Sequence, residues 1–161
     1  MIDHRISLLE KTKLFVLDMD GTFYLGEHMI DGSLEFLRTL EYTGRRYMFF
    51  TNNSSKSQQA YIDKLAGMGI DITPDQMMIS SHVMIHYLKQ NHPGASIYVV
   101  GTPSLIEEFK SFDMPLVEED PDIVVLGFDT TLTYEKLAKA CHYVRGGCIY
   151  YGVNPDWNCP I

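Results

Sequence analysis

Short apolar runs alternate with longer amphipathic segments along the 161-residue chain. Five of these runs have the length and composition of strands buried inside a parallel sheet. They are Leu14–Leu17, Tyr47–Phe50, Ile97–Val100, Ile123–Leu126 and Cys148–Tyr151. Strands that alternate with helices along a chain usually pair in parallel, so the pattern indicates an α/β fold.

The segments between the runs repeat apolar residues every three or four positions, which is the spacing of one helix face. The predicted faces are Tyr61, Leu65 and Met68, then Leu105, Phe109 and Phe112, then Leu137, Cys141 and Val144. Thr73–Gln76 has the form of a capping box with proline at the first helical position. Thr102-Pro103 has the same threonine and proline that open this box. We therefore predict that helices begin at both places.

A seam in this α/β series is predicted between Ser80 and Pro93-Gly94, where one unit ends and another begins. We expect one domain over residues 1–80 and a second over residues 81–161. The first domain carries the strong chemical signals.

The clearest chemical signal is Asp18-Met19-Asp20-Gly21-Thr22, directly after the first apolar run. Side chains alternate along an extended chain, so both carboxylates would lie on one side at the carboxyl end of the strand. Open α/β sheets bind their ligands at this edge, and paired carboxylates repel unless a cation or a shared proton relieves them. Asp-Gly alone also marks a turn or a helix cap, but the whole pattern favours a chemical site.

A second polar cluster, Thr51-Asn52-Asn53-Ser54, follows the second apolar run. Hydroxyl and amide groups ahead of a helix N-terminus are neutral donors that suit a phosphate dianion. An N-capping loop rich in asparagine is the alternative. The acidic pattern on the preceding strand favours phosphate binding.

The formal net charge of −8 argues against nucleic acid and anionic membranes as partners. No apolar run reaches the roughly 18 residues of a membrane-spanning helix, and we find no signal-peptide core at the N-terminus. Cys141, Cys148 and Cys159 lack the spacing of a metal site. We interpret them as free core thiols in a reducing cytoplasm.

Asp18-x-Asp20-Gly-Thr followed by Thr51-Asn52-Asn53-Ser54 resembles motifs I and II of the haloacid dehalogenase (HAD) phosphohydrolase superfamily. Further segments resemble its NagD-like, p-nitrophenyl phosphatase-like branch: Tyr98–Gly101, Val124–Asp129, Thr133–Leu137 and Asn154–Asp156. The resemblance extends over nearly the whole chain. It implies a Rossmann-like core in the N-terminal half, followed by part of an inserted α/β cap domain of the C2 type.

The resemblance also implies roles for the motif residues. Asp18 would be the nucleophile that forms an aspartyl-phosphate, and Asp20 would protonate the leaving alcohol and then activate water. Asp18 and Asp20 would bind Mg²⁺, while Thr51, Asn52 and Asn53 would hold the phosphoryl oxygens. We therefore expect a cytoplasmic, Mg²⁺-dependent hydrolase of small phosphorylated metabolites, with no nucleic-acid or membrane partner, whose copies can pair through the cap.

The sequence departs from the family in one respect. The third motif, which supplies a lysine, and the fourth, which supplies acidic metal ligands, have no counterpart before the sequence ends at Ile161. We therefore expect a fragment or truncated product that carries the nucleophile and half of the phosphate site. Two alternatives stay open: a non-catalytic phosphate- or partner-binding remnant, and a phosphotransferase that acts on a sugar hydroxyl.

Three weaker signals remain. His82 and His86 have the spacing of a zinc pair on a helix, but ordinary polar partners are the favoured interpretation. Asp129 follows a strand, and we interpret it as a capping residue rather than part of a second active site. Trp157 could stack on an aromatic leaving group.

Overall fold

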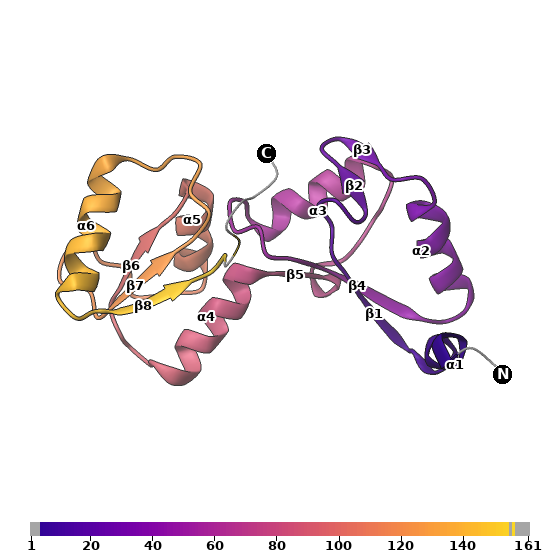
Figure 1. Cartoon of the computed structure of the whole chain (residues 1–161), viewed down its shortest axis with the longest axis horizontal. Helices are drawn as coiled ribbons and strands as arrows, with labels where there is room; N and C mark the ends of the chain where they lie inside the picture. Colours follow the sequence, from indigo (N-terminus) through magenta and orange to yellow (C-terminus); the bar gives the residue numbers. More distant parts are fainter. Residues whose placement is uncertain (1–3, 155, 157–161) are drawn as a thin grey trace. The chain divides into compact units, whose positions relative to one another are not determined.

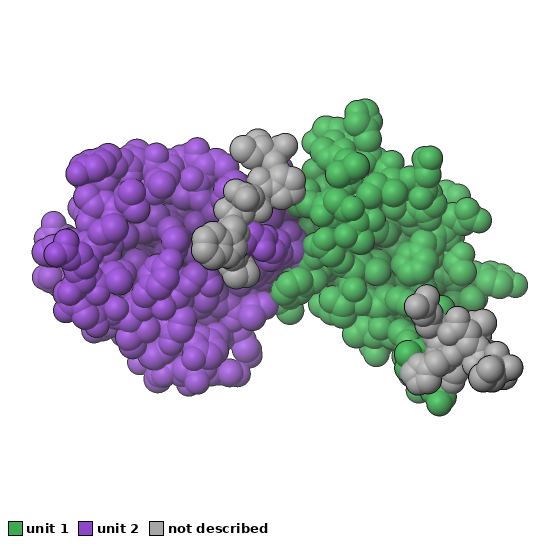
Figure 2. Space-filling model, in the orientation of Figure 1, with its two compact units in different colours: residues 1–50, 62–78, 161 green, residues 51–61, 79–160 purple. Residues whose placement is uncertain are grey.

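The computed structural model describes residues 4–154 and 156 and confirms the predicted α/β fold. Its contacts divide the chain into two compact units (Figure 2). Of the described residues, unit 1 takes in 4–50 and 62–78. Of the described residues, unit 2 takes in 51–61, 79–154 and 156. The second unit thus includes the loop that follows the second predicted strand.

The helices and strands follow one another in the expected alternation (Figure 1). Up to residue 79 they are α1 (His4–Lys11), β1 (Leu14–Leu17), β2 (Tyr24–Leu25), β3 (His28–Met29), α2 (Ser33–Tyr42), β4 (Arg46–Thr51), α3 (Gln58–Gly67), the 3₁₀ turn η1 (Pro74–Gln76) and β5 (Met77–Ile79). They continue as α4 (Ser80–Asn91), β6 (Ile97–Val100), α5 (Pro103–Ser111), β7 (Ile123–Leu126), α6 (Tyr134–Arg145) and β8 (Ile149–Gly152).

The first sheet has the strand order β1-β4-β5. β1 and β4 are parallel, and their register pairs Leu14 with Arg46 and Leu17 with Phe49. The prediction that β1 is buried on both faces is wrong for this chain, because Leu14 is 42% and Val16 60% exposed. β1 is an edge strand of the described sheet, so only β4 covers its flank.

Two local features of this region differ from prediction. The capping box at Thr73 forms, but it begins only the single turn η1, and the chain then continues directly as β5. The antiparallel hairpin β2–β3 was not predicted, since strands of two residues leave no periodic pattern. The hairpin turns at Gly26, whose φ of 57° suits glycine.

The second sheet is fully parallel, with the order β6-β7-β8. Alternate side chains of β6 and β7 face opposite ways, as the period of two requires. One face packs against α4 and α5, through Leu88 and Phe109 among others. The other face packs against α6, through Ala140 and Tyr143. Figure 1 shows α5 and α6 on opposite sides of this sheet, so the connections that leave β6 and β7 go to opposite faces.

The apolar stripe predicted for α6 is less buried than its spacing suggests. Leu137 and Val144 are exposed, and the predicted core thiol of Cys141 is exposed as well. These side chains line an open hollow of about 310 Å³, together with residues of β6 and β7. They therefore face the sheet without closing against it.

None of the helices in the described part of the chain has the length and apolar character needed to cross a membrane.

Candidate active site

The acidic loop follows β1 without a gap. Met19 is completely buried, whereas Asp18 is exposed and Asp20 is half-buried. This alternation is what an extended chain produces when the middle side chain packs into the core. The two carboxylates therefore share the side that faces away from the core at Met19.

Hydrogen bonds within the loop hold its backbone in a tight turn. The N–H groups of Thr22, Phe23 and Tyr24 all donate to the carbonyl of Met19, at 3.2, 2.8 and 3.3 Å. Gly21 adopts a φ of 80°, a conformation that side chains with a Cβ rarely adopt. The hydroxyl of Thr22 donates to Asp18 Oδ2 at 3.0 Å. Within the described residues, this bond engages one carboxylate oxygen of Asp18 and leaves Oδ1 for another ligand.

The second predicted site loop, Thr51–Ser55, is called the Asn52 loop here. Thr51 ends β4 and is buried, and its hydroxyl oxygen accepts a hydrogen bond from the N–H of Asn53 at 3.1 Å. Asn53 Oδ1 accepts from the N–H and the hydroxyl of Ser55, at 3.0 and 2.7 Å. The hydroxyl of Tyr61 donates to the Asn53 carbonyl at 3.0 Å. The bond from the Ser55 N–H to Asn53 Oδ1 forms an Asx turn, and the four bonds together fix the shape of the loop.

The remaining loop residue, Asn52, has partners from distant parts of unit 2. Its amide Nδ2 donates to Asp156 Oδ2 at 2.6 Å. Its carbonyl accepts from the hydroxyl of Ser80 at 3.1 Å. Sequence reasoning did not identify Asp156 as a partner of Asn52, because 104 positions separate them. Two signals pointed to this segment: its place after an apolar strand, and the resemblance of Asn154–Asp156 to the NagD-like branch.

The register of the first sheet relates the strands that precede the two loops. Leu17, the last residue of β1, pairs with Phe49, two residues before the end of β4. Because the strands are parallel, their carboxyl ends share one edge of the sheet, and this is the edge at which α/β sheets bind ligands.

A model of the haloacid dehalogenase-like hydrolase family matches residues 15–115, more than half of the chain. The chain belongs to this family. An acid sugar phosphatase from Staphylococcus aureus is 35% identical over 153 residues, which are 94% of this chain and 59% of that protein.

Solved structures of the family have the same fold. The 4-nitrophenylphosphatase from Thermotoga maritima has a TM-score of 0.91 and 46% identity, over 96% of this chain and 59% of that one. NagD from E. coli K-12 has a TM-score of 0.83 and 25% identity, over 93% and 60%. The resemblance to the NagD-like phosphatases is thereby confirmed. The chain spans about 59% of the length of the relatives that it matches.

The described residues of this chain offer a limited set of metal ligands. Among its described residues, no cluster of three or more His, Cys, Asp or Glu side chains could hold a metal ion. The acidic loop nevertheless provides two neighbouring hard oxygen donors, Asp18 and Asp20, and hard oxygens are what Mg²⁺ prefers. The loop thus fits part of a magnesium shell.

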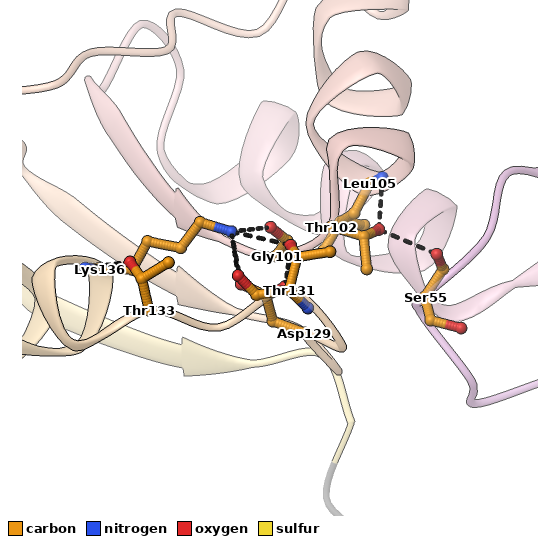
Figure 3. A network of polar contacts seen from close by, with 8 residues as sticks. All are labelled: Ser55, Gly101, Thr102, Leu105, Asp129, Thr131, Thr133 and Lys136. Carbon is orange, nitrogen blue, oxygen red and sulfur yellow. Dashed lines mark hydrogen bonds and ion pairs between the residues drawn. The ribbon is translucent and has the colours of Figure 1, made fainter. Parts of the chain in front are cut away.

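A second aspartate at a strand end, Asp129, belongs to a different arrangement (Figure 3). Its carboxylate accepts a hydrogen bond from Lys136 Nζ at 2.8 Å, and bonds from the N–H and hydroxyl of Thr131 at 2.8 and 2.7 Å. Burial alone would raise the pKa of Asp129. Hydrogen bonds from Lys136 and Thr131, with the lysine charge, outweigh burial and hold the pKa below its ordinary value of 3.8.

The predicted capping role of Asp129 needs a correction. The residue closes a turn at Thr131, while the N-cap of α6 is Thr133, whose hydroxyl accepts from the N–H of Lys136 at 3.2 Å. The carboxylate of Asp129 accepts from the N–H of Thr131, three residues before α6 begins at Tyr134. It is a structural aspartate of the β7–α6 connection.

The histidine pair on α4 has separate partners. His82 pairs with Glu108 on α5 and packs against Phe112. His86 Nε2 lies 3.1 Å from Gln90 Nε2. Each ring therefore has a protein contact of its own. Trp157 and Cys159 lie outside the described residues.

Proposed function

We propose that this chain carries the nucleophile and the phosphate loop of a Mg²⁺-dependent hydrolase of small phosphate monoesters. The observation that supports this most directly is the acidic loop at the carboxyl end of β1, whose neighbour β4 leads into the Asn52 loop. Two of the relatives named above are phosphatases, an acid sugar phosphatase and a 4-nitrophenylphosphatase. A small phosphorylated metabolite is therefore the proposed substrate class.

The first step would form a covalent intermediate. A carboxylate oxygen of Asp18 attacks phosphorus, and the bond between phosphorus and the ester oxygen breaks. Asp20 donates its proton to the departing alkoxide, so the alcohol leaves neutral. The hydroxyl of Thr22 orients the Asp18 carboxylate through its bond to Oδ2. The exposure of Asp18 supports this role, because an attacking oxygen must reach the substrate.

The second step would release phosphate. Asp20, now ionised, removes a proton from water while the water oxygen attacks phosphorus. The bond between phosphorus and the Asp18 oxygen breaks. Asp18 is then ionised and Asp20 protonated, as at the start. Mg²⁺ would be held by the Asp18 carboxylate and the backbone carbonyl of Asp20, and it would supply charge stabilisation for the phosphoryl oxygens.

The Asn52 loop would bind the phosphoryl group. Thr51, Asn52 and Asn53 offer hydroxyl and amide donors, which hold a dianion without adding charge to the site. We also propose that residues 1–80 belong to the catalytic core and 81–161 to the cap. The free thiols of Cys141 and Cys148 fit a cytoplasmic location. Pairing of two copies stays a prediction, which light scattering would check.

The proposal is tested by hydrolysis of p-nitrophenyl phosphate with MgCl₂ or with EDTA. The assay compares this chain with a version extended by the remaining part of the Thermotoga maritima relative. An Asp18→Asn variant of each form is the control. We expect Mg²⁺-dependent turnover in the extended form that Asp18→Asn abolishes.

Other outcomes would identify the alternatives. Turnover that Asp18→Asn leaves intact would refute the proposed nucleophile. Phosphate binding without turnover in either form would favour the non-catalytic remnant. Faster release of p-nitrophenol when a sugar alcohol is added, with sugar phosphate as the product, would favour the phosphotransferase.

A further inference from the structure

The Asn52 loop is hydrogen-bonded to the carboxyl ends of β6 and β7 in unit 2. Thr102, which follows β6, donates its hydroxyl hydrogen to the carbonyl of Ser55 at 2.9 Å. Phe128, which follows β7, donates its backbone N–H to the Ser54 hydroxyl at 2.8 Å. Thr102 and Ser54 are both buried, so water does not compete well for these bonds.

The end of β8 completes the set. Asp156, four residues past the strand, accepts the amide hydrogen of Asn52. Each of the three parallel strands therefore contributes one hydrogen bond to the loop. Parallel strands place their carboxyl ends along one edge of the sheet, so the loop follows that edge from residue 52 to residue 55.

Lys136 joins two of these strand ends to each other (Figure 3). Its Nζ donates to the Gly101 carbonyl at 3.0 Å and to Asp129 at 2.8 Å. Gly101 is the neighbour of Thr102, and Asp129 is the neighbour of Phe128. One ammonium group thus bonds the backbone of the residue before Thr102 and the side chain of the residue after Phe128.

Close packing leaves the loop little room beside these donors. A Cβ on Gly127 would lie 3.1 Å from Ser54 Oγ and 2.3 Å from Leu105 Cδ2. A Cβ on Gly101 would lie 2.5 Å from the same methyl group. Glycine at both positions allows the strand ends to approach the loop and the start of α5.

We propose that the carboxyl edge of the β6-β7-β8 sheet sets the phosphate-binding conformation of the Asn52 loop, with Thr102 and Lys136 as positioning residues. This inference rests on the proposed function, because it assigns phosphate affinity to that loop. By holding the loop in this conformation, the sheet raises the affinity of the loop for phosphate. This effect is separate from any contact between the sheet and the rest of a substrate. Removing one of its bonds weakens phosphate binding without removing a group that touches phosphate.

The test measures binding of inorganic phosphate to the full chain in the presence of MgCl₂, by titration of the backbone amide NMR signals. The variants are Thr102→Val, which removes the hydroxyl, and Thr102→Ser, which keeps it. Thr102→Val is expected to raise the Kd for phosphate about tenfold and to shift the Asn53 and Ser55 amide signals before phosphate is added. Thr102→Ser is expected to restore both.

Ser96→Ala is the matched control. The Ser96 hydroxyl donates to Asp122 Oδ2 at 2.8 Å and accepts from the Asp122 N–H at 3.0 Å. It joins the same two strands at their amino ends, away from the loop. Ser96→Ala is expected to leave the phosphate Kd within about twofold of wild type.

Equal phosphate affinity in wild type and Thr102→Val would overturn the inference while leaving the proposed function intact. An equal loss in Thr102→Val and Ser96→Ala would overturn it too, because a general loosening of the sheet would then account for both. Absence of phosphate binding by the wild-type chain would overturn the inference together with the phosphate role of the loop.

Discussion

The connections that follow β1 and β7 contain similar residues and differ in what their aspartates contact. Each follows an apolar strand that pairs in parallel with a neighbour, and each aspartate accepts a hydrogen bond from a threonine hydroxyl. Thr22 donates to Asp18 at 3.0 Å, and Thr131 donates to Asp129 at 2.7 Å. On sequence alone, both positions could be assigned to a site at a sheet edge.

The difference is the neighbouring cation. The side chain of Asp129 is 1% exposed and forms an ion pair with Lys136 at 2.8 Å. Asp18 is exposed, and its described partner, the Thr22 hydroxyl, is neutral. A carboxylate that the chain itself neutralises is structural, whereas one left accessible can bind a metal or attack a substrate. The contrast predicts opposite consequences of mutation at the two loops.

Replacement of the two aspartates by asparagine gives the largest expected effect. Asp18→Asn is expected to lower kcat/KM for p-nitrophenyl phosphate in the extended form by on the order of 10³-fold or more, because the amide is not a nucleophile. Its free energy of unfolding should change by less than about 0.5 kcal/mol, since the residue is exposed. Asp129→Asn should lower kcat/KM by at most about tenfold and reduce stability instead. Steady-state kinetics and urea denaturation separate the two, and the reverse pattern would contradict the comparison.

Removing the cation tests the structural half of the comparison. Lys136→Met leaves the buried Asp129 carboxylate with its Thr131 hydrogen bonds but without a cation, and we expect the free energy of unfolding to fall by about 2–3 kcal/mol. Lys139→Met, on the same helix, is the matched control. Lys139 lies 3.8 Å from carboxylate oxygens of the exposed Glu118 and Glu135. Exposed pairs contribute little, so its loss should cost less than about 1 kcal/mol in urea denaturation. Equal losses would show that Asp129 does not depend on Lys136.

Acid should weaken the fold through Asp129. Its pKa in the folded chain lies below its ordinary value, so the group stabilises the fold above about pH 4. This contribution is lost as the pH falls through the folded-state pKa. The stability difference between wild type and Asp129→Asn should therefore shrink as urea denaturation is repeated from pH 5 downward. A difference that stays constant over this range would contradict the shift.

The five strands could be predicted because each depends on a local apolar run. Three predicted ranges match the observed strands, as at Ile97–Val100, and Tyr47–Phe50 lies within β4. The prediction failed where a helix-start signal stands directly before a strand. The capping box at Thr73 formed but did not propagate, because the next residues, Met77–Ile79, form a strand in the first sheet.

The site was predictable only in its separate segments. The acidic pattern and the asparagine cluster each lie within a few residues of chain, so both are visible in the sequence. Besides Tyr61, the partners that hold the Asn52 loop come from positions 28 to 104 residues away. Such pairings depend on which strand ends share a sheet edge, and no local pattern encodes them. The sequence favoured a structural role for Asp129 over a second active site, but the ion pair with Lys136 that neutralises its carboxylate was visible only in the structure.

The threonines provide the finest test of the comparison, since both donate to an aspartate. Thr22→Val removes the hydrogen bond that orients the exposed Asp18 carboxylate. Losing it should raise the activation free energy by about 1 kcal/mol, so kcat/KM should fall roughly fivefold in the extended form. Thr22→Ser should restore it, and stability should be nearly unchanged because Thr22 is exposed. Thr131→Val removes a bond to Asp129 and an acceptor for Lys136, so its main effect should be a loss of about 1 kcal/mol of stability. Kinetics and urea denaturation on the same preparations would distinguish the two. If Thr22→Val reduced stability as much as Thr131→Val, the hydroxyl at position 22 would support the fold rather than orient the nucleophile.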